Sequence, residues 1–158
     1  MIVEDLGSFA ESLAKLLPIF CLYLGEKTIG VAASDGLLQA ANAVVTIKRK
    51  KFGVDAAQLL EIAQTRNAAG FILGLPRNMD GSEGPRCQST RAFARNLSAL
   101  TDLPIGFWDE RLSTVAAERA LIEADLTRKR RKEIIDSVAA TYILQGALDR
   151  IRHIRAGT

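Results

Sequence analysis

The sequence has few cysteines, a single histidine and no long apolar run. Its two cysteines, Cys21 and Cys87, form neither a disulfide framework nor a metal-ligand spacing, which favours a reducing cytosol. We interpret His153, close to the C-terminus, as an exposed tail residue without a catalytic role. The apolar stretch 16–24 is interrupted by Pro18 and lacks a signal peptide's basic start and cleavage site, and no other stretch could cross a bilayer. We therefore expect a cytoplasmic protein with no membrane segment.

Internal repeats, low-complexity tracts and linkers are also missing, so we expect residues 1–158 to form one domain. Hydrophobic residues make up 48% of the chain, which is enough for one core. The net charge is +3, and residues 1–75 carry seven basic and seven acidic side chains. Residues 76–158 carry fourteen basic and eleven acidic side chains, so the whole excess lies in the second half. This mild basic bias is compatible with a polyanionic partner.

The spacing of apolar residues predicts a mixed α/β fold. A meander of three strands is followed by helices that alternate with two buried strands, a pattern typical of a mixed sheet flanked by helices. The predicted strands cover 19–24, 28–33, 43–49, 71–75 and 104–108. The predicted helices cover 9–17, 54–67, 86–100, 113–123 and 133–151.

Three carboxylates are the strongest candidates for chemistry. Asp109 and Glu110 follow the last predicted strand, and Asp136 shares a helix face with alanine and isoleucine. Carboxylates at the ends of elements bind Mg²⁺ or Mn²⁺, and such cations promote phosphodiester hydrolysis. The alternatives are local pairs, Asp109-Glu110 with Arg111 and Asp136 with Lys132. Strand alternation lets only one of the two adjacent carboxylates face inward, and we favour Glu110.

Two polar segments are candidates for binding phosphate. The loop 76–85 leads into a helix, and its amides together with Arg77, Asn78 and Arg86 could hold a phosphate; the alternative is a surface loop shaped by turn-forming residues. The segment 128–132 is entirely basic and precedes the Asp136 helix. It is either a solvated charge run or a contact to a phosphate backbone. A helix dipole favours anions at this end, which strengthens the second interpretation.

Four segments, taken in order, resemble the motifs of one family. They are Gly25-Glu26-Lys27-Thr28-Ile29-Gly30-Val31-Ala32 with Ser34-Asp35, the stretch 74–86, Asp109-Glu110-Arg111-Leu112-Ser113-Thr114 with Ala117-Glu118, and Asp136 with Ala139-Ala140 and Ile143-Leu144. This is the YqgF family, related to the RuvC-type Holliday junction resolvases. The resemblance covers residues 19–148. It implies an RNase H-like fold, carboxylates around a divalent metal, and trimming of the 5′ end of the precursor of 16S rRNA.

The resemblance also implies roles for individual residues. Asp109 or Glu110, together with Asp136, would hold Mg²⁺ or Mn²⁺, which activates water and stabilises the leaving oxygen. Phosphate contacts and positioning of the nucleic-acid strand would come from Lys27, Arg77, Asn78, Arg86, Arg111, Ser113 and Thr114.

One position departs from the family pattern. The first motif normally reads Gly-hydrophobic-Asp-hydrophobic-Gly, and here it reads Cys21-Leu22-Tyr23-Leu24-Gly25, with Tyr23 at the Asp position. A phenol, whose unperturbed pKa is about 10, is a poor substitute for a carboxylate. Asp35, at the far end of the next strand, is a poor replacement. Two alternatives to rRNA cleavage stay open. The relationship to RuvC implies a resolvase-type DNA endonuclease, and Tyr23 favours an RNA-binding factor with weakened catalysis.

Overall fold

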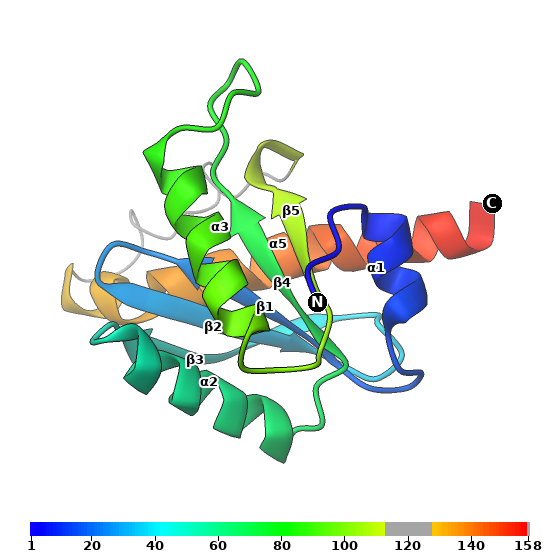
Figure 1. Cartoon of the computed structure of the whole chain (residues 1–158), viewed down its shortest axis with the longest axis horizontal. Helices are drawn as coiled ribbons and strands as arrows, with labels where there is room; N and C mark the ends of the chain where they lie inside the picture. The colour runs from blue at the N-terminus through cyan, green and yellow to red at the C-terminus, as the bar shows by residue number, and fades with distance from the viewer. Residues whose placement is uncertain (113–127, 158) are drawn as a thin grey trace.

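The computed structural model describes residues 1–112 and 128–157, and the side chains of all these residues except 128–134. Its centre is a five-stranded sheet in the order β3-β2-β1-β4-β5 (Figure 1). The β1–β2 and β2–β3 pairs are antiparallel, and the β1–β4 and β4–β5 pairs are parallel. The strands are β1 (Ile19–Leu24), β2 (Thr28–Ser34), β3 (Ala41–Lys48), β4 (Gly70–Leu75) and β5 (Ile105–Asp109). The predicted meander and the predicted mixed sheet are both confirmed.

Helices cover both faces of this sheet. In Figure 1, α2 (Phe52–Thr65) and α3 (Pro85–Ser98) lie on one face, and α5 (Arg128–Gly157) runs across the other. The two faces have separate cores because alternate side chains of a strand point to opposite sides. On β1, Tyr23 packs with α5 residues, while Leu22 packs with residues of α2 and α3. No helix among the described residues is long and apolar enough to cross a membrane.

Two helix boundaries differ from the prediction. The first helix, α1, covers Leu6–Ser12 rather than 9–17. Asp5 starts it by accepting a hydrogen bond from the Ser8 amide at 2.8 Å, and the backbone is already extended at Leu13. The apolar Leu16 made the predicted helix too long. In the structure this residue is 72% exposed and has a left-handed backbone conformation. The last helix begins at Arg128, so the basic segment forms its first turns, and it ends at Gly157; the predicted helix 113–123 lies outside the described residues.

The helix α5 approaches the sheet closely at Gly30 on β2. A Cβ atom at this position would collide with the backbone carbonyl of Asp136 and with the amide of Ser137. The next turn of α5 presents Ala139 and Ala140, which are both buried and small enough for close packing. The helix is thus pressed against the sheet at the point that carries Asp136.

Candidate active site

The adjacent carboxylates at the end of β5 lie on opposite faces of the sheet. Phe107 belongs to the core under α2 and α3, and Trp108 to the core under α5. By alternation, Asp109 points to the same face as Phe107, and Glu110 lies on the α5 face. A Cβ atom on Gly74 of β4 would be 2.8 Å from Oε1 of Glu110, so the glutamate side chain extends over this glycine. Of the two carboxylates, it is Glu110 that points toward α5.

Asp136 reaches the same face of the sheet from α5. Its side chain is buried, with 8% exposed, and its Oδ2 accepts a hydrogen bond from the hydroxyl of Thr28. The same oxygen lies so close to Gly25 that a Cβ atom there would collide with it. A buried carboxylate costs free energy unless it is hydrogen-bonded. Thr28 and the β1–β2 turn therefore fix the position of Asp136, while Lys132, its alternative partner, lies outside the described side chains.

Tyr23 and Arg86 join these carboxylates. Tyr23 is buried on β1, on the α5 face, directly opposite Gly30. The guanidinium of Arg86, near the start of α3, forms a hydrogen bond with Tyr23, and this bond is the main cause that raises the pKa of Arg86. The negative charges of Glu110 and Asp136 raise this pKa further. The guanidinium of Arg86 thus lies beside the phenol and within the electrostatic field of both carboxylates.

A pocket of about 660 Å³ opens at this place, where β1 ends and α3 begins. Its walls come from four parts of the chain that are distant in sequence. They include Tyr23, Gly25, Glu26, Arg49, Arg86 and Asp136. Sequence reasoning missed Arg49, which donates a hydrogen bond to the carbonyl of Gly25 at 2.8 Å. The basic run to which it belongs, 48–51, was the signal that could have revealed it.

The predicted local pairing of Asp109 with Arg111 is confirmed. The Arg111 guanidinium lies 2.7 Å from Oδ2 of Asp109, and its Nη1 also donates to the carbonyl of Met79 at 3.4 Å. The hydrogen bond from Arg111 is the main cause that lowers the pKa of Asp109. The hydrogen bond from Arg111 to Met79 fastens the β4–α3 loop to the end of β5.

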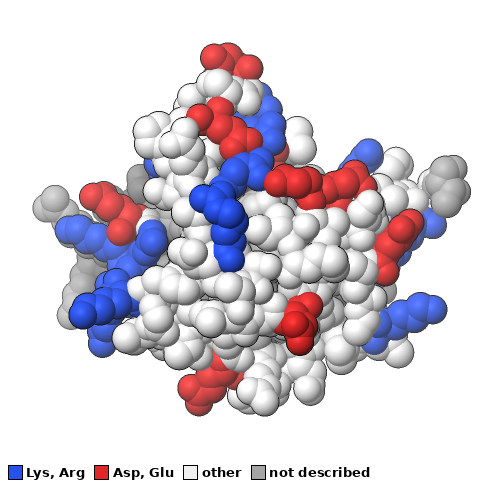
Figure 2. Space-filling view, in the orientation of Figure 1, with Lys and Arg blue, Asp and Glu red and all other residues white. Residues whose placement is uncertain are grey.

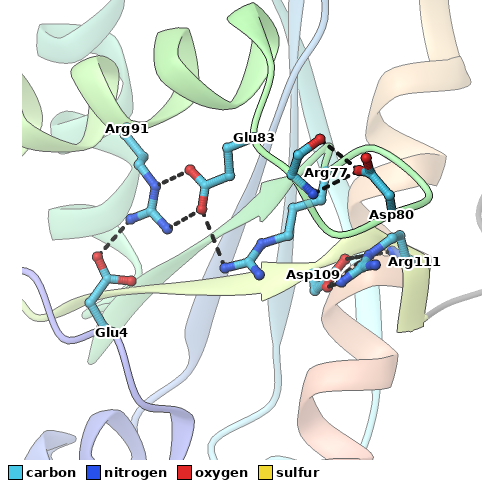
Figure 3. A network of polar contacts seen from close by, with 8 residues as sticks. Glu4, Arg77, Asp80, Glu83, Arg91, Asp109 and Arg111 are labelled. Carbon is cyan, nitrogen blue, oxygen red and sulfur yellow. Dashed lines mark hydrogen bonds and ion pairs between the residues drawn. The ribbon is translucent and has the colours of Figure 1, made fainter.

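The β4–α3 loop is also held by internal contacts (Figure 3). Glu83 accepts hydrogen bonds from Arg91 at 2.6 and 2.8 Å and lies 3.4 Å from Arg77. Arg91 also binds Glu4, 2.6 Å away, and the amide of Asn78 donates to Ser82. Charges of both signs therefore neutralise each other across this region.

The predicted phosphate contacts are spread over the molecule. Arg86 lines the pocket, and Lys27 is exposed in the β1–β2 turn beside it. Arg77, Asn78 and Arg111 take part in the loop network instead, and Ser113 and Thr114 lie outside the described residues. Contact with phosphate stays a prediction for all of them.

The donor set does not match a cation held by three carboxylates. In the described part of the chain, no three His, Cys, Asp or Glu side chains converge on one point. The α5 face offers Glu110 and Asp136, with the phenol of Tyr23 at the expected third position and a guanidinium already among them. Arg86 therefore places a positive charge beside these carboxylates.

Comparison with known proteins gives consistent results. The family model described as "RuvX: Holliday junction resolvase" matches residues 18–150. A protein of Ruegeria sp. (strain TM1040), named "Putative pre-16S rRNA nuclease", is 66% identical over 156 residues, covering 99% of both chains. A protein of Paracoccus denitrificans with the same name is 64% identical and covers 98% of both. Among solved structures, Thermus thermophilus RuvC bound to a Holliday junction substrate has a TM-score of 0.53 at 11% identity, covering 90% of this chain and 97% of that one. This likeness shows an RNase H-like fold.

Proposed function

This chain belongs to the RuvX (YqgF) family of nucleases, and we propose that its substrate is the precursor of 16S rRNA, cleaved near the 5′ end. Membership makes it a phosphodiester hydrolase that binds nucleic acid. The names of its relatives support the choice of precursor rRNA. The proposal includes action in the cytoplasm, in agreement with two free, buried cysteines.

The observation that carries this proposal is that Arg86 and Asp136 line one pocket, while Glu110 points to the same face of the sheet as Asp136. These side chains come from the end of β5, from α5 and from the start of α3. A guanidinium can donate two parallel hydrogen bonds to a phosphate, and a carboxylate beside it can accept a proton. In our proposal Arg86 binds and orients the phosphodiester, while Thr28 keeps Asp136 directed at it.

The RuvC-like fold suggests dependence on a divalent metal. The more specific proposal is Mg²⁺ or Mn²⁺, for which Glu110 and Asp136 are the carboxylate donors on the α5 face. Tyr23 stands where the family pattern has a third carboxylate. We therefore expect weak cation binding and slow turnover in this chain. RNA binding through Arg86 should persist, since a guanidinium keeps its charge without metal.

The experiment compares cleavage and binding on one substrate. The purified protein is incubated with a precursor-16S 5′ fragment during a Mn²⁺ titration, and its affinity for the same RNA is measured in chelator. We expect tight binding in chelator and slow cleavage that rises with Mn²⁺. Metal-independent cleavage at full rate would contradict the role given to Tyr23, and no binding would contradict the function.

A second candidate function is endonuclease activity on branched DNA. Its support is the fold shared with RuvC and the description of the matching family model. Competition between a four-way DNA junction and the precursor-rRNA fragment separates the two substrates. We expect the RNA to displace the junction; the reverse order would favour the DNA function.

A further inference from the structure

Five basic side chains gather where β3 ends and α2 begins. They are Lys27, Lys48, Arg49, Lys50 and Lys51, all exposed, and we call them the β3–α2 basic surface. Figure 2 shows lysine and arginine side chains concentrated at this end of the molecule. Two backbone contacts hold the members together: Lys48 pairs with Thr28 across the strands, and the amide of Arg49 donates to the carbonyl of Lys27 at 2.9 Å.

Among the described side chains, these cations lack the ion pairs that other basic residues form. Arg77, Arg91, Arg111 and Arg152 all form ion pairs, but no described acidic side chain pairs with a member of the β3–α2 basic surface. Asp55 is close but buried, and it accepts a hydrogen bond from the backbone amide of Lys50 at 3.1 Å. Repulsion within such a cluster destabilises the folded chain unless an anion binds to it.

Helix stability does not account for the run either. Lys51 is the N-cap of α2, and its side chain makes no capping hydrogen bond. The positive end of the helix dipole favours acidic residues at this position, so a series of lysines there is mildly unfavourable. A bound polyanion would interact favourably with these lysines and with the positive end of the helix dipole.

The β3–α2 basic surface is continuous with the pocket through one residue. Arg49 lines the pocket, and its hydrogen bond to the carbonyl of Gly25 fixes it at the pocket rim. A strand whose phosphate is bound by Arg86 would meet Arg49 on leaving the pocket and then the three lysines that flank it. Glu26, also in the pocket wall, is the acidic neighbour that such a strand would have to pass.

We propose that the β3–α2 basic surface binds the phosphate backbone of the RNA segment that flanks the cleavage site. The identity of the polyanion as RNA rests on the proposed function. The surface supplies affinity and direction for the strand and takes no part in hydrolysis, because its lysines lie outside the group formed by Glu110, Asp136 and Arg86.

The test removes three charges at two ends of the molecule. One variant is Lys48→Gln/Lys50→Gln/Lys51→Gln, which spares Arg49 and its hydrogen bond. The matched control is Lys15→Gln/Arg150→Gln/Arg152→Gln, which removes three exposed charges at the far end, near α1 and the end of α5. Binding of the precursor-16S fragment is measured in chelator over a salt series. Each lost phosphate contact lowers the log–log salt slope by about 0.7–0.9, so the first variant should lose about two to three units and the control less than one.

Three results separate the surface from the function. Equal salt slopes in the two triple variants would contradict RNA binding by the β3–α2 basic surface, but they would not affect the proposed nuclease function. Normal RNA binding through this surface, without cleavage even in a Tyr23→Asp background, would overturn the nuclease function alone. Hydrolysis of bis(p-nitrophenyl) phosphate, which is too small to reach the lysines, should be unchanged by the first variant in that background. A loss of this hydrolysis would contradict a role limited to binding.

Discussion

The two faces of the sheet use the same kinds of residues for different purposes. On the α3 face, Asp109 and Glu83 each meet an arginine that neutralises them, and the result is a fastened loop. On the α5 face, Glu110 and Asp136 share one guanidinium beside a pocket. Asp109 and Glu110 are adjacent in sequence, so residue type does not distinguish them. The difference comes from strand alternation and from the opposing helix.

The largest expected difference between the faces concerns catalysis. In a Tyr23→Asp background, Glu110→Gln and Asp136→Asn should each lower cleavage of the precursor fragment at least about 100-fold, the size of losing a main catalytic group. Asp109→Asn should keep the rate within about threefold, because its carboxylate pairs with Arg111 on the face opposite Glu110 and Asp136. All three variants keep side-chain shape, and circular dichroism checks their folding. Equal losses in all three would show that the faces do not differ in function.

A second prediction tests how α5 is positioned. Gly30→Ala places a methyl group against the backbone of Asp136 and Ser137, which cannot move without displacing the helix. We expect a loss of about 2–3 kcal/mol in the free energy of unfolding, as for overpacked cores, measured by urea denaturation. The control is Gly53→Ala on α2, where a Cβ atom meets nothing within 4 Å. This substitution should stabilise the chain by about 0.5 kcal/mol. Similar effects at the two glycines would contradict the close contact.

A third prediction concerns the basic segment at the start of α5. Replacing Arg128, Lys129, Arg130, Arg131 and Lys132 by glutamine should weaken RNA binding and flatten its dependence on salt. The log–log slope should fall by about 0.7–0.9 for each phosphate contact that is lost. An unchanged slope would mean that the segment is a solvated surface.

The smallest expected effect lies on the α3 face. Asp109→Asn removes a partly exposed ion pair, worth about 0.2–1 kcal/mol of stability at neutral pH. Arg111 lowers the pKa of Asp109 in the folded protein, so the stabilisation is complete above the unfolded value of about 3.9. It is lost as the pH falls through the folded-state pKa. The difference in stability between the two proteins should therefore shrink as the pH falls below the unfolded value and disappear below the folded-state pKa, and a difference that stays constant throughout acidification would exclude the pair as its source.

Much of the fold could be predicted because local patterns determine it. The buried strand 71–75 is continuously apolar, and the meander alternates with clear turns, so all five strands and the mixed sheet were expected. Alternation let only one of Asp109 and Glu110 face inward, and the contact of Glu110 with Gly74 agrees with the preference for Glu110. The boundaries of α1 were wrong because a cap at Asp5 and an exposed Leu16 outweighed apolar spacing. That residues 1–158 form one domain stays a prediction.

The interactions within the site were beyond local patterns. The hydrogen bond between Arg86 and Tyr23 joins α3 to β1, and the bond between Thr28 and Asp136 joins β2 to α5. The sequence spacing of neither pair predicts the contact, because each contact depends on how the helices cross the sheet. Arg49 was overlooked for the same reason, because it enters the pocket only when β3 pairs with β2.

The central claim is that the pocket beside Glu110 and Asp136 is the active site, and that Tyr23 limits it. The most direct test assays the unmodified chain and Tyr23→Asp side by side on the precursor-16S fragment during a Mn²⁺ titration. The third carboxylate should tighten cation binding and raise cleavage at least tenfold, equivalent to about 1.4 kcal/mol of barrier. RNA affinity in chelator should not rise. If the chain with Tyr23 cleaves as fast as the variant at every Mn²⁺ concentration, the β1 position is not a ligand and the account of the site is wrong.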